Sequence, residues 1–352
     1  TRLDDAVRRI LYVKKQLGLF GNPVPNLDEY TLFGGEDFKK AAKTAALESI
    51  TLLKNENAAL PLSAGQRILV AGPGANSLNM LNGAWTHTWQ GLDTNYNTKG
   101  ALTIYKALTQ AFPANSISHI QGVELYMEKD FEASRFLDIA GYKKALKKND
   151  VIVICVGELP STEKPGDIRS LQLDVKQKEL VRLAKAANKK VVLVLLEARP
   201  RIIHDIEPLC DAIVQAYLPG DQGGIAIAEL FSGKEDFSGH LPYTYPRYDG
   251  VIEFYDHPRS VDRSKSGDFS AYNPQWDFGF GLSYNNAQIG KAKFESKNEK
   301  DGSFTISVTV SNPNQKMVKT LVPVYLSDLY ASTSPEGKRL IGFNKVTLNP
   351  GE

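Results

Sequence analysis

Six consecutive apolar residues, Val151 to Val156, constrain the fold of this chain more than any other feature. A short, fully apolar segment between turn residues is typical of a buried strand, most often a parallel strand covered on both faces. Four further segments are expected to be strands, at Arg67–Ala71, Ile117–Ile120, Val191–Leu196 and Ala212–Ala216. Helical spacing of apolar residues predicts helices between the strands, at Phe38–Leu53, Ile104–Ala111, Phe136–Lys147, Lys176–Ala187 and Gly223–Phe231. This alternation predicts an α/β fold with a mostly parallel sheet sandwiched between helices.

The pattern changes along the chain and divides it into four expected regions. Residues 1–36 hold an amphipathic helix, Leu3–Leu19, and a proline-rich linker, and residues 37–247 hold the α/β domain. Residues 248–284 show no sustained periodicity and are interpreted as a long connecting loop. In residues 285–352 apolar and polar residues alternate, which predicts an antiparallel β-sandwich. Because only 68 residues remain there, against roughly 100 in a complete immunoglobulin-like sandwich, we expect it to be truncated or completed by another segment.

Composition and charge exclude several classes of partner. The chain carries 42 Lys and Arg residues against 40 Asp and Glu residues, without long blocks of like charge, so nothing calls for nucleic acid or an anionic membrane surface. No apolar run is long enough to span a membrane. Cys155 and Cys210 have no metal-ligand spacing and form no disulfide framework, so we expect buried free thiols and no metal. We also expect no cofactor. The first residues, from Thr1, resemble neither a signal peptide nor a natural start, and we expect a mature or cut product.

A glycine-containing turn, Gly72–Ser77, follows an expected strand and has some features of a dinucleotide-binding loop. The third glycine of that motif is missing, a proline occupies the tight turn, and no clear helix begins at Ser77. We therefore interpret this segment as a strand-to-loop turn that binds no nucleotide.

The loop after the apolar run Val151–Val156 is the best candidate for chemistry. It places three carboxylates, Glu158, Glu163 and Asp167, beyond the carboxyl end of a buried strand, where ligands of open α/β sheets bind. Glycoside hydrolysis needs one protonated carboxylic acid and a second carboxylate on the other side of the sugar. A solvated rim or a helix cap is the alternative, and it is more common for a loop that contains three acids.

A second candidate segment, Gly83–Gly91, holds two of the chain's three tryptophans, Trp85 and Trp89. Indole faces are flat and apolar, and they suit stacking on sugar rings. Packing in the core is the alternative for both residues, and it is favoured for Trp85. His87 lies between them without a second ligand close by in the sequence, so we expect no metal site here.

Several short motifs follow one another along the chain. They are Lys54–Asn57 with Leu60–Leu62, the Trp-x-x-x-Trp-Gln-Gly segment, Gly157–Asp167, Arg199–Pro200, Pro219–Gly220 with Gly223–Gly224, Ser238–Pro242 and Phe278–Tyr284. In this combination and order the chain resembles glycoside hydrolase family 3 over essentially its whole length. The Trp-Gln-Gly form is similar to the β-glucosidase and exo-β-glucanase branch of that family.

The resemblance implies a three-part architecture. In the family an amino-terminal TIM barrel carries the aspartate nucleophile, an α/β sandwich domain carries the acid/base glutamate, and many members add a fibronectin type III-like domain. Residues 1–36 resemble the end of the barrel region, residues 37–247 the second domain, and residues 285–352 an incomplete third domain. The barrel is therefore the expected partner within the same protein, and the nucleophile is expected there rather than in this chain.

The resemblance also implies roles for the candidate residues. Glu163 matches the family's acid/base, with Glu158 as the second choice. Trp89 matches the tryptophan that forms one wall of the outer sugar subsite, and Trp85 matches a neighbouring aromatic residue. The implied reaction is retaining hydrolysis of terminal non-reducing β-D-glucosyl residues from an oligosaccharide or β-glucoside, in the periplasm or outside the cell.

Two other functions stay open on the sequence. In the first, the chain is a non-catalytic glycan-binding or structural module. In the second, its parent enzyme cleaves β-xylosides or β-N-acetylglucosaminides, activities that also occur in the family. Because the nucleophile is expected in the barrel, the chain alone is predicted to be inactive.

Overall fold

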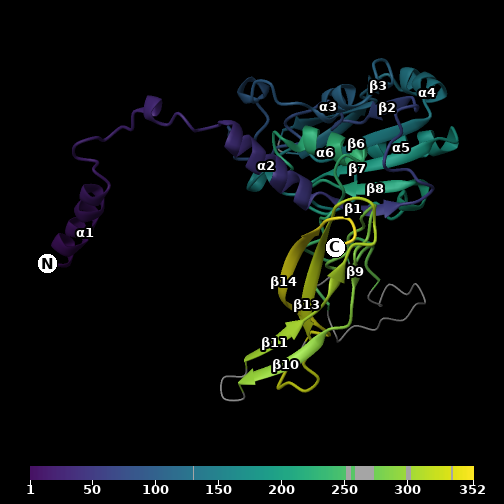
Figure 1. Cartoon of the computed structure of the whole chain (residues 1–352). Helices are drawn as coiled ribbons and strands as arrows, with labels where there is room; N and C mark the ends of the chain where they lie inside the picture. Colours follow the sequence, from purple (N-terminus) through teal and green to yellow (C-terminus); the bar gives the residue numbers. More distant parts are fainter. Residues whose placement is uncertain (130, 251–254, 258–272, 299–302, 334–335) are drawn as a thin grey trace. The chain divides into compact units, whose positions relative to one another are not determined.

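The computed structural model describes residues 1–129, 131–250, 255–257, 273–298, 303–333 and 336–352. The chain forms two units, residues 1–41 and residues 42–352, whose elements are labelled in Figure 1. The smaller unit contains α1 (Arg2–Gln16), the 3-10 turn η1 (Leu27–Glu29) and the start of α2 (Glu36–Ser49). The Thr1 hydroxyl accepts a hydrogen bond from the Asp4 amide, and the Asp4 carboxylate accepts one from the Thr1 amino group. This reciprocal pair caps the first turn of α1.

The core of the larger unit is a six-stranded sheet with the strand order β1-β8-β7-β6-β2-β3. The strands are β1 (Thr51–Asn55), β2 (Ile68–Ala71), β3 (Ile117–Ile120), β6 (Val151–Gly157), β7 (Lys190–Leu196) and β8 (Ala212–Gln215). Neighbours pair in parallel except β1, which runs antiparallel to β8. The mostly parallel sheet and its five predicted strands are therefore confirmed.

Strand β1 corrects the prediction of one helix running through Leu53. Helix α2 ends at Ser49, and the chain continues as a strand. Leu52 packs in the core on one face of the sheet and Leu53 in the core on the other face. Successive residues point to opposite faces only in a strand, so burial on both faces decides between the two conformations. The pairing of Leu52 with Val214 of β8 fixes the register.

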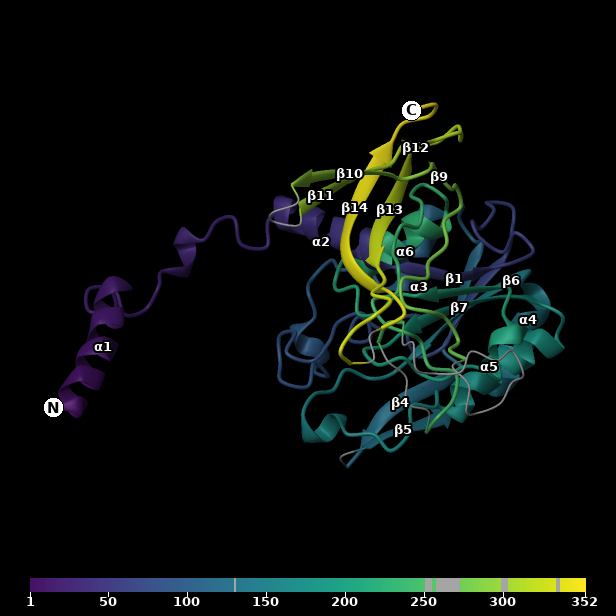
Figure 2. The ribbon, with the colours of Figure 1, turned by 90° about the horizontal axis from the view of Figure 1, so that it is seen from below.

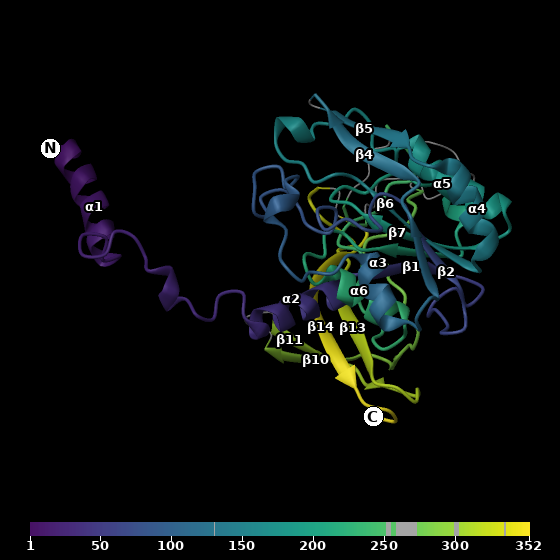
Figure 3. The same cartoon turned by 90° about the horizontal axis from the view of Figure 1, so that it is seen from above.

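Helices cover both faces of the sheet, as Figure 3 shows. On one face lie α3 (Ile104–Ala111) and α6 (Gly223–Phe231), and on the other lie α4 (Ile139–Lys148) and α5 (Val175–Ala186). Val153 of β6 belongs to the first core and Ile154 to the second, which explains the continuously apolar sequence of this strand. Cys155 and Cys210 are buried free thiols, as predicted. Among the described residues, no helix is both long and apolar enough to cross a membrane.

An antiparallel hairpin, β4 (Val123–Glu128) with β5 (Phe131–Phe136), follows β3 and lies on the α5 side of the sheet in Figure 3. The sequence predicts a helix that begins at Phe136. In the structure Phe136 is the last residue of β5, and α4 begins only at Ile139, with Asp138 as its N-cap. Val123 and Leu125 are the buried residues of β4, while β5 is partly or fully exposed. Such a hairpin leaves too weak a hydrophobic pattern to be distinguished from a loop.

Six further strands lie within the described part of residues 285–352. They pair as β9 (Gln288–Ile289) with β12 (Val310–Ser311), β10 (Lys293–Asn298) with β11 (Ser303–Ser307), and β13 (Val318–Leu326) with β14 (Arg339–Leu348). All three pairs are antiparallel, in agreement with the alternating sequence, and Figure 2 shows the β13–β14 ribbon clearly. A fibronectin type III-like sandwich stays a prediction. Most of the predicted loop 248–284 lies outside the described residues, at 251–254 and 258–272.

Candidate active site

The two candidate segments come from neighbouring strands at one edge of the sheet. The chain passes from β2 through α3 to β3 on one side, and then through α4 to β6 on the other side of β2. The strand order thus reverses between β2 and β6, and ligands of open α/β sheets bind outside the carboxyl ends of strands at such a point. The tryptophan segment, Gly83–Gly91, lies in the connection after β2, and the carboxylate loop, Glu158–Asp167, follows β6 directly.

A glycine at the end of β6 and another directly after β2 allow the backbone of the neighbouring strand to approach closely. Gly157 at the end of β6 has a φ of 150°, and a Cβ there would lie 1.8 Å from the carbonyl oxygen of Leu196. Gly72 after β2 has a φ of 94°, and a Cβ there would lie 2.3 Å from the carbonyl oxygen of Cys155. Larger residues do not fit at either position, so the strand ends approach closely only because glycine has no side chain.

Glu163 lines a cavity of about 220 Å³ together with residues of the tryptophan segment, Gly83 and Ala84. Its side chain is exposed. It precedes the 3-10 turn η3 (Lys164–Gly166) and has φ 55° and ψ −148°, a conformation that costs a non-glycine residue about 1–3 kcal/mol. Strain of this size persists only where the surroundings hold the backbone in place.

Side chains from three other segments hold the backbone of the carboxylate loop. The Glu132 carboxylate accepts a hydrogen bond from the Leu159 amide, and the Arg199 guanidinium donates one to the Gly166 carbonyl. The Gln90 side chain donates to the Thr162 carbonyl and accepts from the Thr162 amide. These three side chains belong to β5, to the connection after β7 and to the tryptophan segment, respectively. The loop is therefore fixed near its beginning, in its middle and near its end.

Glu158 lies at the base of the loop in a buried ion network and is only 4 % exposed. Its carboxylate accepts hydrogen bonds from the amides of Ala198 and Arg199, both at 3.0 Å, and from the guanidinium groups of Arg199 and Arg201. Burial acts to raise the pKa of Glu158, but the hydrogen bonds and charges of the two arginines outweigh it and hold the pKa below its usual range. Glu158 is thus ionised at neutral pH and is poorly suited to donate a proton.

Sequence reasoning missed two acids beside this network, Glu197 and Glu132. Glu197 follows β7 and is 1 % exposed, and its Oε1 accepts hydrogen bonds from the Tyr245 hydroxyl at 2.9 Å and the Arg201 amide at 3.2 Å. Burial raises the pKa of Glu197 to about 8 and the pKa of Glu132 to about 7. A carboxylate directly after a continuous apolar strand is the sequence signal that could have identified Glu197; Glu132 lies in the unpredicted hairpin and has none.

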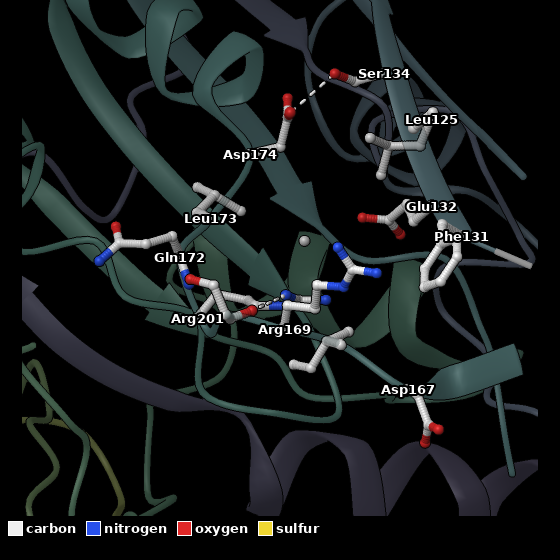
Figure 4. A pocket seen from close by; sticks show the side chains of 14 residues that line it. Leu125, Phe131, Glu132, Ser134, Asp167, Arg169, Gln172, Leu173, Asp174 and Arg201 are labelled. Atoms are coloured by element: carbon white, nitrogen blue, oxygen red, sulfur yellow. Dashed lines mark hydrogen bonds between the residues drawn. The ribbon is translucent and has the colours of Figure 1, made fainter. Parts of the chain in front are cut away.

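A cavity of about 290 Å³ lies between β5 and the segment that leads into α5 (Figure 4). Glu132 and Phe131 line it from β5, and the Arg169 guanidinium lies 5.6 Å from the centre of the Phe131 ring. The Asp174 carboxylate accepts a hydrogen bond from the Ser134 hydroxyl at 2.8 Å. Because these groups engage one another, we assign no reaction to this cavity. In the described part of the chain, no group of three or more His, Cys, Asp or Glu side chains is placed to hold a metal ion.

Both tryptophans of the tryptophan segment lie at the surface of this chain. Trp85 is 68 % exposed and Trp89 is 47 % exposed. The prediction that Trp85 packs in the core is therefore wrong. The Trp85 amide donates to the Trp89 carbonyl at 2.9 Å, within a turn in which Trp85 and His87 have positive φ. Within this chain, a turn closed by its own backbone hydrogen bond holds both indoles outside the core.

A family model for the glycosyl hydrolase family 3 C-terminal domain matches residues 50–284. The chain belongs to glycosyl hydrolase family 3. It is 37 % identical over its whole length to a lysosomal β-glucosidase of Dictyostelium discoideum, covering 44 % of that protein. It is 32 % identical over 99 % of its length to a periplasmic β-glucosidase of Salmonella typhimurium, covering 49 % of that protein. A solved structure of a mutant β-glucosidase from Listeria innocua in complex with laminaribiose matches with a TM-score of 0.82 and 26 % identity, over 99 % of this chain and 48 % of that one.

The family 3 match includes the sheet, the tryptophan segment and the carboxylate loop. The family predicted from the motifs is therefore confirmed, as is the α/β part of the fold. The chain spans about half the length of the curated relatives it matches, which is consistent with a carboxy-terminal part.

The buried Glu197 of this family 3 domain predicts a loss of stability as the pH rises. The folded protein keeps a proton on this carboxyl up to about pH 8, whereas the unfolded chain releases it near the ordinary pKa of 4.5. The free energy of unfolding therefore declines between these two pH values. We expect Glu197→Gln to flatten that decline in urea unfolding measured from about pH 5 to about pH 8. The surface substitution Glu179→Gln should leave the slope unchanged, and an unchanged slope in Glu197→Gln would contradict the prediction.

Proposed function

We propose that this chain is the carboxy-terminal part of a retaining β-glucosidase that hydrolyses terminal non-reducing β-D-glucosyl residues of oligosaccharides or β-glucosides. The observation that carries the proposal is the placement of Glu163, an exposed carboxylate on a strained and anchored loop beside a cavity shared with the tryptophan segment. The β-glucosidase names of the relatives support the reaction and the sugar.

In this proposal Glu163 is the acid/base. A retaining glycosidase uses one carboxylic acid to protonate the leaving oxygen, while a second carboxylate about 5 Å away attacks the anomeric carbon. Glu163 donates its proton in this first step and accepts a proton from the attacking water in the second. Glu158 stays the second choice, because Arg199 and Arg201 hold it as a carboxylate. The nucleophile is an aspartate of a TIM barrel that precedes the α/β domain, and no cofactor takes part.

The proposal extends to the organisation of the whole protein. We assign residues 1–36 to the end of the barrel region, residues 37–247 to the α/β sandwich domain, residues 248–284 to a connecting loop, and residues 285–352 to a fibronectin type III-like domain. The periplasmic and lysosomal names of two relatives support a parent protein that works in the periplasm or is secreted.

The proposed reaction is tested on the native protein that contains this chain. We expect the highest kcat/KM on 4-nitrophenyl β-D-glucoside, with lower values on the β-xyloside and the β-N-acetylglucosaminide, and NMR should show the β-anomer of glucose as the first product. A higher kcat/KM on the xyloside or the N-acetylglucosaminide would contradict the proposed specificity for glucose. The α-anomer as first product would exclude a retaining mechanism. The chain alone is expected to show no turnover, because the proposal places the nucleophile in the barrel.

Trp89 is proposed to stack on the substrate at the outer sugar subsite, beside Trp85. We expect Trp89→Ala to raise KM for a disaccharide by about tenfold with a smaller effect on kcat, since losing one face of apolar contact costs about 1–2 kcal/mol. Tyr330→Ala removes another exposed aromatic side chain, far from the tryptophan segment in the sequence, and should change neither constant. A lower kcat at unchanged KM in Trp89→Ala would contradict a stacking role.

A non-catalytic glycan-binding module is the second candidate, and the exposed indole of Trp89 is the observation that favours it. Calorimetric titration of the chain with laminari-oligosaccharides separates the two functions. Binding in the millimolar range or tighter, abolished by Trp89→Ala, together with a native protein that hydrolyses no glycoside, would favour the binding module.

A further inference from the structure

The side chain of Gln90 joins the tryptophan segment to the carboxylate loop. Its Nε2 donates a hydrogen bond to the carbonyl oxygen of Thr162 at 3.1 Å, and its Oε1 accepts one from the Thr162 amide at 3.0 Å. The two residues are 72 positions apart in the chain. This paired contact has the form of the exchange between two antiparallel strands, and a primary amide offers the donor and the acceptor that it needs.

The contact falls on the residue directly before Glu163. On the other side, the Gly166 amide donates to the Glu163 carbonyl at 2.8 Å, and the Gly166 carbonyl accepts from the Arg199 guanidinium. The backbone of Glu163 is therefore held between two anchored residues at φ 55° and ψ −148°. A backbone in so sparsely populated a region relaxes when one of its restraints is removed.

The orientation of the Glu163 side chain is not set by polar contacts in the described part of the chain. Within the described residues its carboxylate makes no hydrogen bond and no ion pair. Its direction therefore depends on the Cα–Cβ bond from which its rotamers start. A small rotation of the loop at Thr162 would move the carboxyl group by a distance that matters for proton transfer, which needs heavy atoms about 2.6–3.2 Å apart.

We propose that Gln90 is a positioning residue for the proton donor: it holds Thr162, and through Thr162 it directs Glu163 toward the leaving oxygen of the bound glycoside. This inference rests on the proposed acid/base role of Glu163. Because Gln90 directly follows Trp89, the same contact also sets the separation between the stacking indole and the acid. One side chain thus couples the position of the sugar to the delivery of the proton.

The dependence of the rate on the leaving group tests this role. A 2,4-dinitrophenolate departs without a proton, whereas the sugar released from a disaccharide needs one. In the native protein that contains this chain, we expect Gln90→Ala to lower kcat/KM for laminaribiose by roughly tenfold or more. On 2,4-dinitrophenyl β-glucoside the loss should stay below about threefold, because proton transfer contributes little there.

Three other variants define the comparison. Glu163→Gln removes the proton donor and should show the same substrate dependence with a larger loss on laminaribiose. Gln90→Glu keeps the acceptor for the Thr162 amide but loses the donor, so its loss should fall between those of the native protein and Gln90→Ala. Gln66→Ala removes a glutamine that accepts from the Ser63 amide at 2.8 Å, before β2, and should change neither substrate.

Hydrogen exchange provides a readout that does not depend on activity. The peptide that covers residues 158–167 should take up deuterium faster in Gln90→Ala, because the Thr162 amide loses its acceptor. Unchanged exchange would overturn the inference, as would equal losses on both substrates or no loss on either. If Gln90→Ala does not fold, Gln90→Glu gives the leaving-group comparison with a smaller loss on laminaribiose, because it keeps the acceptor for the Thr162 amide.

The experiment also separates this inference from the function on which it rests. If Glu163→Gln shows no leaving-group dependence, the acid/base assignment fails and the inference fails with it. If Glu163→Gln shows that dependence and both Gln90 variants do not, the proposed function stands and only the role of Gln90 is refuted.

Discussion

Glu163→Gln is expected to lower kcat for a disaccharide substrate by roughly 10²- to 10⁴-fold in the native protein that contains this chain. Glutamine keeps the size of the side chain but has no acidic proton for the leaving oxygen. With a 2,4-dinitrophenyl glucoside the first step stays fast, and the glycosyl-enzyme accumulates because the same residue is the base of the second step. Steady-state rates on both substrates, together with a burst of dinitrophenolate, measure the two effects.

A second acid of the same loop is the matched control for this variant. Asp167 is also exposed, and Asp167→Asn should keep kcat within about threefold of the native value, because the proposal gives it no proton to transfer. Azide added to Glu163→Ala should restore turnover of the dinitrophenyl substrate and form the β-glucosyl azide, since this nucleophile needs no base. Equal losses in the Glu163 and Asp167 variants would contradict the assignment.

Glu158→Ala is expected to lower the free energy of unfolding by about 3–5 kcal/mol in urea titrations at neutral pH. The substitution leaves the Arg201 guanidinium, whose side chain is 8 % exposed, without its counter-charge. It also removes the acceptor of the amides of Ala198 and Arg199. Because the pKa of Glu158 is lowered in the folded protein, its contribution is present above its ordinary pKa of 4.5 and is lost as the pH falls through the folded pKa. The difference between native protein and variant should therefore shrink in acid.

Two further substitutions separate charge from packing. Glu158→Gln keeps the shape and removes the charge, so a loss close to that of Glu158→Ala would show that the charge dominates. Glu336→Gln breaks an exposed ion pair with Arg339 and should leave the unfolding midpoint nearly unchanged. A midpoint for Glu158→Ala as close to native as that of Glu336→Gln would contradict the role of the buried network.

Elements with strong local patterns were predictable from the sequence. The six apolar residues of β6 fit a strand that is buried on both faces, and the structure places them in one. Helices α3 and α6 lie where the helical spacing of apolar residues predicts them. The hairpin β4–β5 and the strand β1 were missed. Their pairing partners, and not their own residues, decide that they are strands: β4 and β5 bury little surface, and β1 forms only because β8 offers it an edge.

The candidate site shows the same division. That Glu163 and Glu158 follow a buried strand could be predicted, but their contrasting environments could not. Residues distant in the sequence create them: Arg199 and Arg201 surround Glu158, and Gln90 holds the residue before Glu163. The exposure of Trp85 likewise depends on a turn closed by its own backbone, which the sequence does not display.

The α/β class, the order of most strands and helices, the family, and the two segments from which a site could be built were all predictable from the order of the residues. That these segments meet at the reversal of strand order, and that two carboxylates five residues apart differ in burial and in their ionic contacts, became visible only in the folded chain. The two kinds of information differ in the separation, along the chain, of the residues that interact. Periodicity and turn chemistry act between neighbours in the chain, whereas desolvation, ion pairing and hydrogen bonds between loops depend on residues that folding alone brings together.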